Sequence, residues 1–391
     1  MVYLDHAATT PVRAAVADVV SAEMGRIGNP SSLHNAGRRA RRVVEEARET
    51  IAGALGATPH EVVFTGGGTE ANNLAVKGLY WARTRADPRR RRILVSSVEH
   101  HAVLDAAHWL AEAQGAECVQ LPVDEYGMVQ PEAFHEELRR DPDGTALASV
   151  MWANNEVGTI QPVAELARIA RDYDVPLHTD AVQAPAQLPV DFAGSGVSAL
   201  TVSGHKLGGP MGVGALLLER GVEPTPVLHG GGQERDLRSG TVMTPLVAGM
   251  AAAVELVHRE RDEHVATLTA LRGSLLDEVR RVVPDVVLNG HPSQRLPGNV
   301  HLTFPGCAAD ALLLLLDAAG IACSTGSACT TGVAQPSHVL LAMGADRDSA
   351  LGALRFTLGP GSSPADITEL GHALGPAVQR ARRAEAVRGD R

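Results

Sequence analysis

The chain has 391 residues, of which 45% are hydrophobic and 20% charged, and its formal net charge is -10. This length predicts two or three domains with a large core, and the acidic balance argues against a general nucleic-acid-binding protein. No apolar stretch reaches the roughly 18 residues that a membrane span needs, and the first residues lack the pattern of a secretory signal. We therefore expect a cytoplasmic enzyme that does not engage a membrane.

Apolar runs and helical periods alternate along the first part of the chain. A segment of small residues precedes a helix that should start near Pro11, and an amphipathic helix runs through residues 48–55. This alternation predicts an α/β fold with a largely parallel, seven-stranded sheet covered by helices on both faces. The expected strands are 61–65, 92–97, 118–121, 146–152, 176–179, 199–203 and 213–218.

A long helical pattern from Gly249 to Val283 separates this region from a different one. After Pro284 the pattern changes to shorter strands and helices, which predicts a smaller α+β domain that also takes in the N-terminal segment. We expect a large domain at residues 12–258 and a small domain made of residues 1–11 and 259–391.

The cysteines show no pattern typical of a metal site or a disulfide framework. Cys118, Cys307, Cys323 and Cys329 form no Cys-x-x-Cys pair and have no histidine at ligand spacing. In a reducing compartment they should be free thiols, and we expect no bound metal.

The first loop with residues suited to ligand binding is Thr65 to Asn73, which follows a predicted strand and begins a helix. Its bare amides, with Gly68 and the Thr69 hydroxyl at the helix start, are typical of a phosphate cradle. The same residues also match the dinucleotide-binding pattern G-x-G-x-x-A, which requires an acidic residue about 20 positions later. Because the next strand runs instead into Ser96 to His101, we expect a smaller phosphate-bearing cofactor.

Polar residues stand at the ends of the following strands, where α/β sheets bind ligands. His100 can stack on an aromatic ring and move protons, and Asn155 places an amide at the same edge. Asp180 ends a buried strand and needs a cationic partner, such as a protonated pyridine nitrogen. Gln183 lies three residues further on, within reach of a ring hydroxyl.

The next strand ends in Ser203-Gly204-His205-Lys206, a lysine presented between glycines. A free lysine amine is neutral in only about one molecule in 2,500 at pH 7, so a nucleophilic lysine needs a special environment or an existing Schiff base. With Ser203 and His205 as phosphate contacts and Lys206 as the Schiff base, each polar group of pyridoxal phosphate has a partner. The combination predicts that cofactor.

Two loops follow further along the chain. Residues 229–241 are glycine-rich, with two arginines and Thr241 at the end. Residues 323–332 are mostly small and carry Cys329 at the tip, where a thiol is accessible to partners. Beside a pyridoxal phosphate site, Cys329 is a candidate nucleophile.

Taken together, these motifs resemble those of cysteine desulfurases of the iron-sulfur-cluster and nitrogen-fixation type, within the class V aminotransferase superfamily of fold type I pyridoxal phosphate enzymes. The resemblance covers nearly the whole chain. It rests on the N-terminal segment at residues 3–10, on residues 64–70, on Asn154 to Gly158, on Ser203 to Lys206 and on Gly326 to Cys329.

The resemblance implies the following roles. Lys206 carries the cofactor, with His100 stacked on it and the two sharing proton transfer, and Arg355 and Asn155 contact the substrate. L-cysteine gives up its sulfur to Cys329, alanine leaves, and the persulfide passes to an acceptor protein for iron-sulfur cluster assembly or tRNA thiolation. The cofactor's ring and phosphate are held by Gly68, Thr69, His100, Asn155, Asp180, Gln183, Ser203, His205 and Lys206, with Thr241 donated by the other protomer of a homodimer.

The chain departs from its relatives at three places, with Met211 where a lysine is common, Cys323 as a second thiol near Cys329, and Pro360-Gly361 after Leu358-Gly359. We expect these to affect loop behaviour or partner choice. Another class V aminotransferase or lyase, a dinucleotide-dependent oxidoreductase and a non-catalytic sulfur carrier or scaffold remain alternatives. The identity of the acceptor and the use of selenocysteine stay open.

Overall fold

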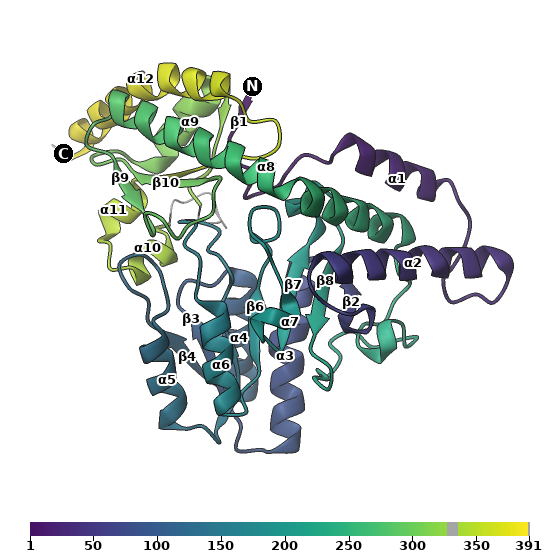
Figure 1. Ribbon diagram of the computed structural model, residues 1–391. Helices are drawn as coiled ribbons and strands as arrows, with labels where there is room; N and C mark the ends of the chain where they lie inside the picture. The colour runs from purple at the N-terminus through teal and green to yellow at the C-terminus, as the bar shows by residue number, and fades with distance from the viewer. Residues whose placement is uncertain (327–334, 390–391) are drawn as a thin grey trace.

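The structure is a computed structural model of the chain and describes residues 1–326 and 335–389. Its centre is a seven-stranded sheet with the order β2-β8-β7-β6-β5-β3-β4 (Figure 1). Strand β8 is antiparallel to both neighbours, and the remaining pairs are parallel. The strands are β2 (Val62–Thr65), β3 (Arg92–Ser96), β4 (Glu117–Leu121), β5 (Thr145–Ser149), β6 (Leu177–Asp180), β7 (Ala199–Ser203) and β8 (Gly214–Leu218).

Helices pack on both faces of this sheet because its buried strands alternate their side chains between two apolar layers. Val63 belongs to the core that contains residues of α3 and α4, while its neighbour Phe64 belongs to the core that contains residues of α2, α5 and α6. Ile93 and Leu94 divide in the same way. These helices are α2 (Asn35–Ala54), α3 (Gly68–Ala86), α4 (His101–Gln114), α5 (Pro131–Arg140) and α6 (Val163–Asp172).

The 39-residue helix α8 (Thr244–Val282) links this layered region to the rest of the chain (Figure 1). It packs against α1 (Ala14–Met24) and α2 at one part and against α12 (Pro364–Gly389) at another. Val254 belongs to the core of the sheet, whereas Leu268 belongs to a second core. This change of core along one helix supports the division that we propose between residues 258 and 259.

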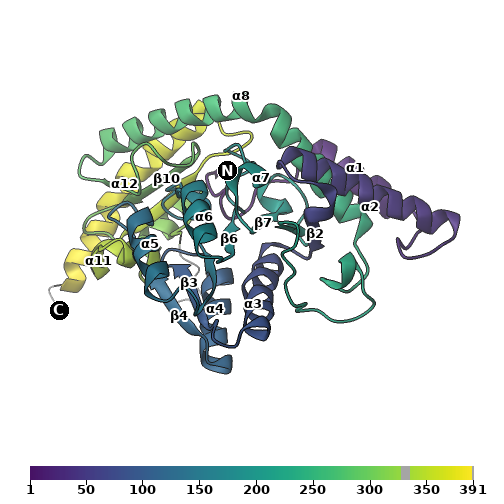
Figure 2. The same ribbon diagram turned by 60° about the horizontal axis from the view of Figure 1, so that its bottom comes forward.

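The second core also contains Leu4, which comes from the N-terminus. There β1 (Val2–Tyr3) pairs in parallel with β11 (Ile321–Ala322), so the chain begins beside its C-terminal part. Figure 2 shows α12 beside part of α8 in the same region. The other elements here are β9 (Val287–Asn289), β10 (Asn299–Thr303), α9 (Ala309–Ala318), α10 (His338–Ala342), α11 (Arg347–Leu351) and β12 (Ala353–Thr357), with β10 between β9 and β12.

The predicted α/β class, the seven strands and the smaller α+β part are confirmed. Two helix starts were predicted wrongly: α1 begins at Ala14 rather than near Pro11, and α8 begins at Thr244 rather than Gly249. Pro245 stands in the first turn of α8, where a missing amide proton costs nothing. Among the described residues no helix is long and apolar enough to cross a membrane, and no group of three or more metal-ligating side chains gathers.

Candidate active site

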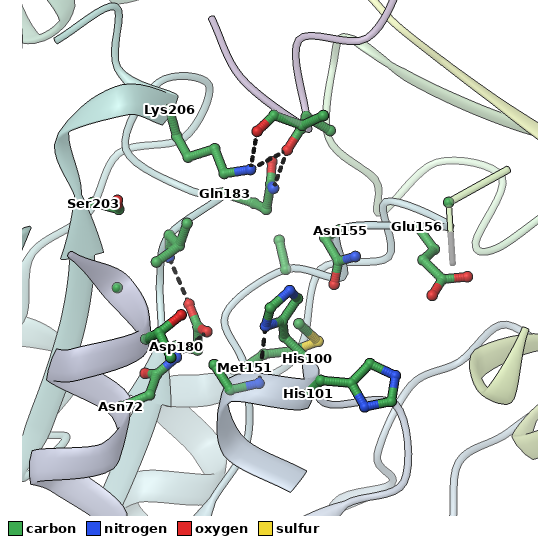
Figure 3. A pocket seen from close by; sticks show the side chains of 18 of the residues that line it. Asn72, His100, His101, Met151, Asn155, Glu156, Asp180, Gln183, Ser203 and Lys206 are labelled. Carbon is green, nitrogen blue, oxygen red and sulfur yellow. Dashed lines mark hydrogen bonds between the residues drawn. The ribbon is translucent and has the colours of Figure 1, made fainter. Parts of the chain in front are cut away.

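A cavity of about 400 Å³ lies where the carboxyl ends of the parallel strands meet the N-terminus of α3 (Figure 3). The segments that follow β3, β5, β6 and β7 each contribute side chains to it, as expected for an α/β sheet. The sequence-predicted residues that line it are Gly68, Thr69, His100, Asn155, Asp180, Gln183, Ser203, His205, Lys206 and Arg355.

One end of the cavity is suited to a phosphate group. The amides at the start of the 19-residue helix α3 have no partner in the preceding turn, and Gly68 lies close to β7 and to the turn after β6. A Cβ atom at Gly68 would stand 3.0 Å from Val182 Cγ2, so a larger residue would crowd the cradle. Ser203 lines the same end.

His205 stands beside this end of the cavity. Its Nδ1 lies 3.3 Å from Thr9 Oγ1. Burial, with the nearby Lys206, lowers the pKa of His205 to about 4. The ring is therefore neutral at physiological pH and acts as a hydrogen-bonding group rather than a cation.

Asp180 presents a buried carboxylate to the middle of the cavity. Its side chain is fixed because Asn72 Nδ2 donates to Oδ2 at 2.6 Å and the Val182 amide donates to Oδ1 at 2.9 Å (Figure 3). Neither donor carries a full charge. A cationic ligand atom would thus complete the site, as the sequence predicts.

His100 is the N-cap residue of α4, and its Nδ1 accepts a hydrogen bond from the Ala102 amide at 3.0 Å (Figure 3). An accepting Nδ1 carries no proton, so the neutral ring keeps its proton on Nε2. Burial and the charge of Lys206 lower the pKa of His100, although the Asp180 carboxylate opposes them. His100 can therefore give or take a proton through Nε2.

Lys206 Nζ donates to the backbone oxygens of Ala7 at 2.5 Å and Ala8 at 2.7 Å (Figure 3). Gln183 Nε2 donates to the same Ala7 oxygen at 3.0 Å. Burial, followed by the positive charge of Arg355, lowers the pKa of Lys206 to about 8. A much larger share of this amine is neutral near pH 7 than in an exposed lysine, which favours covalent chemistry.

Arg355 comes from β12, so the smaller part of the chain contributes to the cavity wall. Its guanidinium donates to Asp5 Oδ1 at 2.8 Å and to the Asn155 backbone oxygen at 2.8 Å. Its Nε has no hydrogen-bond partner among the described residues. The group is held in place and retains capacity for an anion such as a carboxylate.

The structure does not place two of the sequence-predicted residues in the cavity lining, for different reasons. Thr241 is exposed and does not line it, and Cys329 lies outside the described residues. The polar lining residues that the sequence did not assign to the site are Asn72, His101, Glu156, Ser324 and His338. Asn72 could have been found, because it lies one helical turn after Gly68.

Comparisons with known proteins agree with this geometry. The family model described as "Aminotransferase class-V" matches residues 2–370. An "IscS-like cysteine desulfurase" of Mycobacterium tuberculosis is 56% identical over 98% of each chain, and a "Cysteine desulfurase IscS" of Dictyoglomus turgidum is 45% identical over 94% of this chain and 91% of the relative. The chain belongs to the cysteine desulfurases of the class V aminotransferase family.

Solved structures support the same family. A "NIFS-LIKE PROTEIN" superposes with a TM-score of 0.89 at 34% identity and covers 97% of this chain and 99% of its own. DndA of Streptomyces lividans is 40% identical, with a TM-score of 0.77 over 92% of this chain and 100% of its own.

Class V cysteine desulfurases depend on pyridoxal 5'-phosphate, and the cavity fits this cofactor. A Cβ at Gly68 would crowd the cradle, which suits the phosphate. Among the described residues Asp180 has no cationic hydrogen-bond partner, and the ring nitrogen would supply one. Lys206, with its pKa lowered by burial, suits the aldehyde carbon.

Proposed function

We propose that this chain removes sulfur from L-cysteine, with Cys329 as the sulfur acceptor, and releases L-alanine. The observation that carries the proposal is one cavity in which Lys206, His100, Asp180 and Arg355 converge. The resemblance of Gly326 to Cys329 to the family motif supports the choice of nucleophile.

Each side chain of the cavity has a separate role in this reaction. Arg355, fixed by Asp5, binds the substrate carboxylate, and Asn155 lies next to it in the wall. When bound at Lys206, pyridoxal phosphate would supply the electron withdrawal that makes the substrate's Cα proton acidic. Lys206 Nζ takes the Cα proton, and the neutral His100 exchanges a proton through Nε2.

The sulfur step balances as a displacement. The Cys329 thiolate forms an S–S bond to the substrate sulfur while the Cβ–S bond breaks, and the electron pair of that bond stays on the carbon fragment. That fragment is protonated and leaves as alanine, while the persulfide remains on Cys329.

Cys329→Ser tests this function. Cofactor absorbance and cysteine binding should persist, while alanine formation and persulfide labelling should fall by at least about 100-fold, since a hydroxyl is a far poorer nucleophile toward sulfur. Alanine formation at the wild-type rate would overturn the role of Cys329. Cys323→Ser is the matched control, because burial raises the pKa of that thiol to about 12.

Lys206→Ala tests the cofactor site independently. The wild-type adduct should be trapped by borohydride reduction at residue 206, and the variant should yield none. A trapped adduct on Lys77, the other lysine of the chain, would show that the cofactor binds there and not at Lys206.

We further propose a cytoplasmic homodimer in which Thr241 contacts the phosphate in the partner's cavity, because Thr241 is exposed and does not line the cavity of its own chain. The persulfide then passes to a cluster scaffold or a tRNA thiolase. Labelled sulfur loaded on the enzyme, followed by capture of the labelled protein, would identify the acceptor.

A further inference from the structure

Asn72 is a buried residue of the cavity wall to which the reaction above assigns no role. It lies one turn after Gly68 on α3 and is only 1% exposed. Its side-chain nitrogen donates to Asp180 Oδ2 at 2.6 Å, and Figure 3 shows the two side chains beside each other. The two residues are 108 positions apart in the chain, so the tertiary fold makes this contact.

The orientation of the Asn72 amide follows from the same contact. If the amide were turned over, its oxygen would face the Asp180 carboxylate, and two acceptors with no proton between them repel each other. In the orientation that forms, Asn72 Oδ1 has no hydrogen-bond donor among the described residues. A buried acceptor and a buried carboxylate thus lie together in the cavity lining, where both favour a ligand atom that carries a proton or a positive charge.

A second buried carboxyl group lies near Asp180. Glu99 is completely buried, and its Oε1 accepts from the Met151 amide at 2.5 Å. Its Oε2 has no hydrogen-bond partner in the part of the chain that the structure describes. The following amide, that of Trp152, donates to the backbone oxygen of Asp180 at 2.9 Å. Two consecutive residues after β5 therefore support both acidic residues.

Hydrogen bonds determine which of these two carboxyl groups carries the negative charge, because each donor that points at a carboxylate stabilises its charged form. Within residues 1–326 and 335–389, two donors bind the side chain of Asp180 and one binds that of Glu99. Burial, followed by the negative charge of Asp180, raises the pKa of Glu99 well above its usual range. Glu99 therefore holds a proton near neutral pH. Without Asn72 each group would have one donor, and the charge would no longer be confined to Asp180.

We propose that Asn72 is a positioning residue for the cofactor and acts through Asp180. Its hydrogen bond holds the Asp180 carboxylate in one orientation and keeps the negative charge there, where it can pair with a protonated ring nitrogen. This inference rests on the part of the proposed function that pairs Asp180 with pyridoxal phosphate. It does not depend on the role of Cys329.

Asn72→Leu tests the inference, because leucine has the branching of asparagine but no donor. The full-length enzyme is freed of cofactor and reconstituted with an equimolar mixture of pyridoxal phosphate and its 1-deaza analogue, in which CH replaces the ring nitrogen. Only the natural cofactor can be protonated at that position, so only its binding gains from the charge on Asp180. Mass spectrometry of the released cofactors measures the ratio in which the two were bound.

The wild-type enzyme should bind at least about tenfold more pyridoxal phosphate than analogue, the scale of one charged hydrogen bond. In Asn72→Leu this ratio should fall by about fivefold or more, because the charge is then shared with Glu99. A merely structural role for Asn72 would weaken the binding of both cofactors equally, so an unchanged ratio would overturn the inference. Asn72→Ala adds no bulk and suits a helix, so it gives the same comparison should the leucine variant fail to fold.

Two controls accompany these variants. Because Glu99 is uncharged, Glu99→Gln should leave the ratio within about twofold of wild type, and a fall as large as that in Asn72→Leu would place the charge on Glu99 and overturn the inference. Asn289→Ala removes another amide donor, which binds Thr303 Oγ1 at 2.8 Å and does not line the cavity. Its ratio should be unchanged, and a fall there would show that the loss of any such amide alters the ratio, which would also overturn the inference.

Failure of the proposed function gives a different result. If the wild-type enzyme binds both cofactors equally, Asp180 does not pair with the ring nitrogen, and the role of Asn72 is refuted with that pairing. If the wild-type enzyme prefers pyridoxal phosphate and Asn72→Leu prefers it to the same extent, only the role of Asn72 is refuted. Turnover of cysteine enters neither measurement, so the Cys329→Ser experiment remains independent.

Discussion

The ion pair between Arg48 and Glu234 allows a sharp test of what stabilises the loop before Thr241. Arg48 donates to both carboxylate oxygens of Glu234, at 2.7 Å and 2.9 Å, and the Phe64 amide donates to the same carboxylate at 2.7 Å. The two side chains are only 7% and 3% exposed. Glu234→Ala would leave a guanidinium and an amide buried without their partner. We expect the free energy of unfolding to fall by about 3–5 kcal/mol.

Glu45→Ala is the matched control, because Glu45 contacts the same guanidinium at 3.2 Å but is 48% exposed. It should cost less than about 1 kcal/mol. Urea denaturation of the holoenzyme, followed by helical circular dichroism, measures both changes. A loss for Glu234→Ala no larger than that for Glu45→Ala would refute the reasoning. Arg48→Met in the Glu234→Ala background should recover stability, since no unpaired charge then stays buried.

The same pair fixes an unusual backbone. Glu234, Arg235 and Asp236 have φ values of 49°, 59° and 63°, three consecutive left-handed residues that are not glycine. Each costs about 1–2 kcal/mol, so the contacts of Glu234 must offset that strain. Trypsin should therefore cut Glu234→Ala after Arg235 or Arg238 faster than it cuts wild type at the same positions.

Three other changes have outcomes that follow from single contacts. Arg355→Lys should raise the KM for cysteine about tenfold at unchanged cofactor content, because an ammonium cannot hold Asp5, the Asn155 oxygen and a carboxylate together. Burial lowers the pKa of His178 to about 3, so as the pH falls the unfolded chain takes up a proton on this residue before the folded chain does. The free energy of unfolding should therefore fall as the pH drops from about 6.5 toward 3. In urea titrations between pH 7 and 5, His178→Gln should reduce this pH dependence by at most about 1.4 kcal/mol per pH unit. Gly359→Ala should lower the thermal midpoint, because its Cβ would lie 2.2 Å from His6 Nδ1, whereas the helical Gly273, with nothing within 4 Å, should tolerate alanine or gain about 0.5–1 kcal/mol.

The strands and most helices were predictable from the sequence because apolar runs and helical periods are patterns of neighbouring residues. The order of the strands was harder, since every apolar run of that length has the same pattern. One feature was within reach: only residues 204–213 join β7 to β8, which is too short for a parallel crossover and indicates the antiparallel pair that forms.

The strand-end residues of the cavity were predictable because parallel strands deliver their carboxyl ends to one edge. Contacts between distant positions were not. The hydrogen bond from Ser337 to Glu156 joins residues that are 181 positions apart, and no sequence motif links the two. Arg355 could be assigned only through the resemblance, since its neighbours in sequence are ordinary strand residues.

The N-terminal segment explains how the two parts of the chain make one cavity. Asp5 binds Arg355 of β12, the oxygens of Ala7 and Ala8 accept from Lys206, and Thr9 contacts His205. Residues 5–9 thus pass between the strand ends of the large sheet and the smaller part, and they engage both. Because the backbone oxygens of Ala7 and Ala8 face Lys206, a long side chain at either position would compete with the cofactor for the same space. The small residues Ala7 and Ala8 therefore form part of the active-site wall.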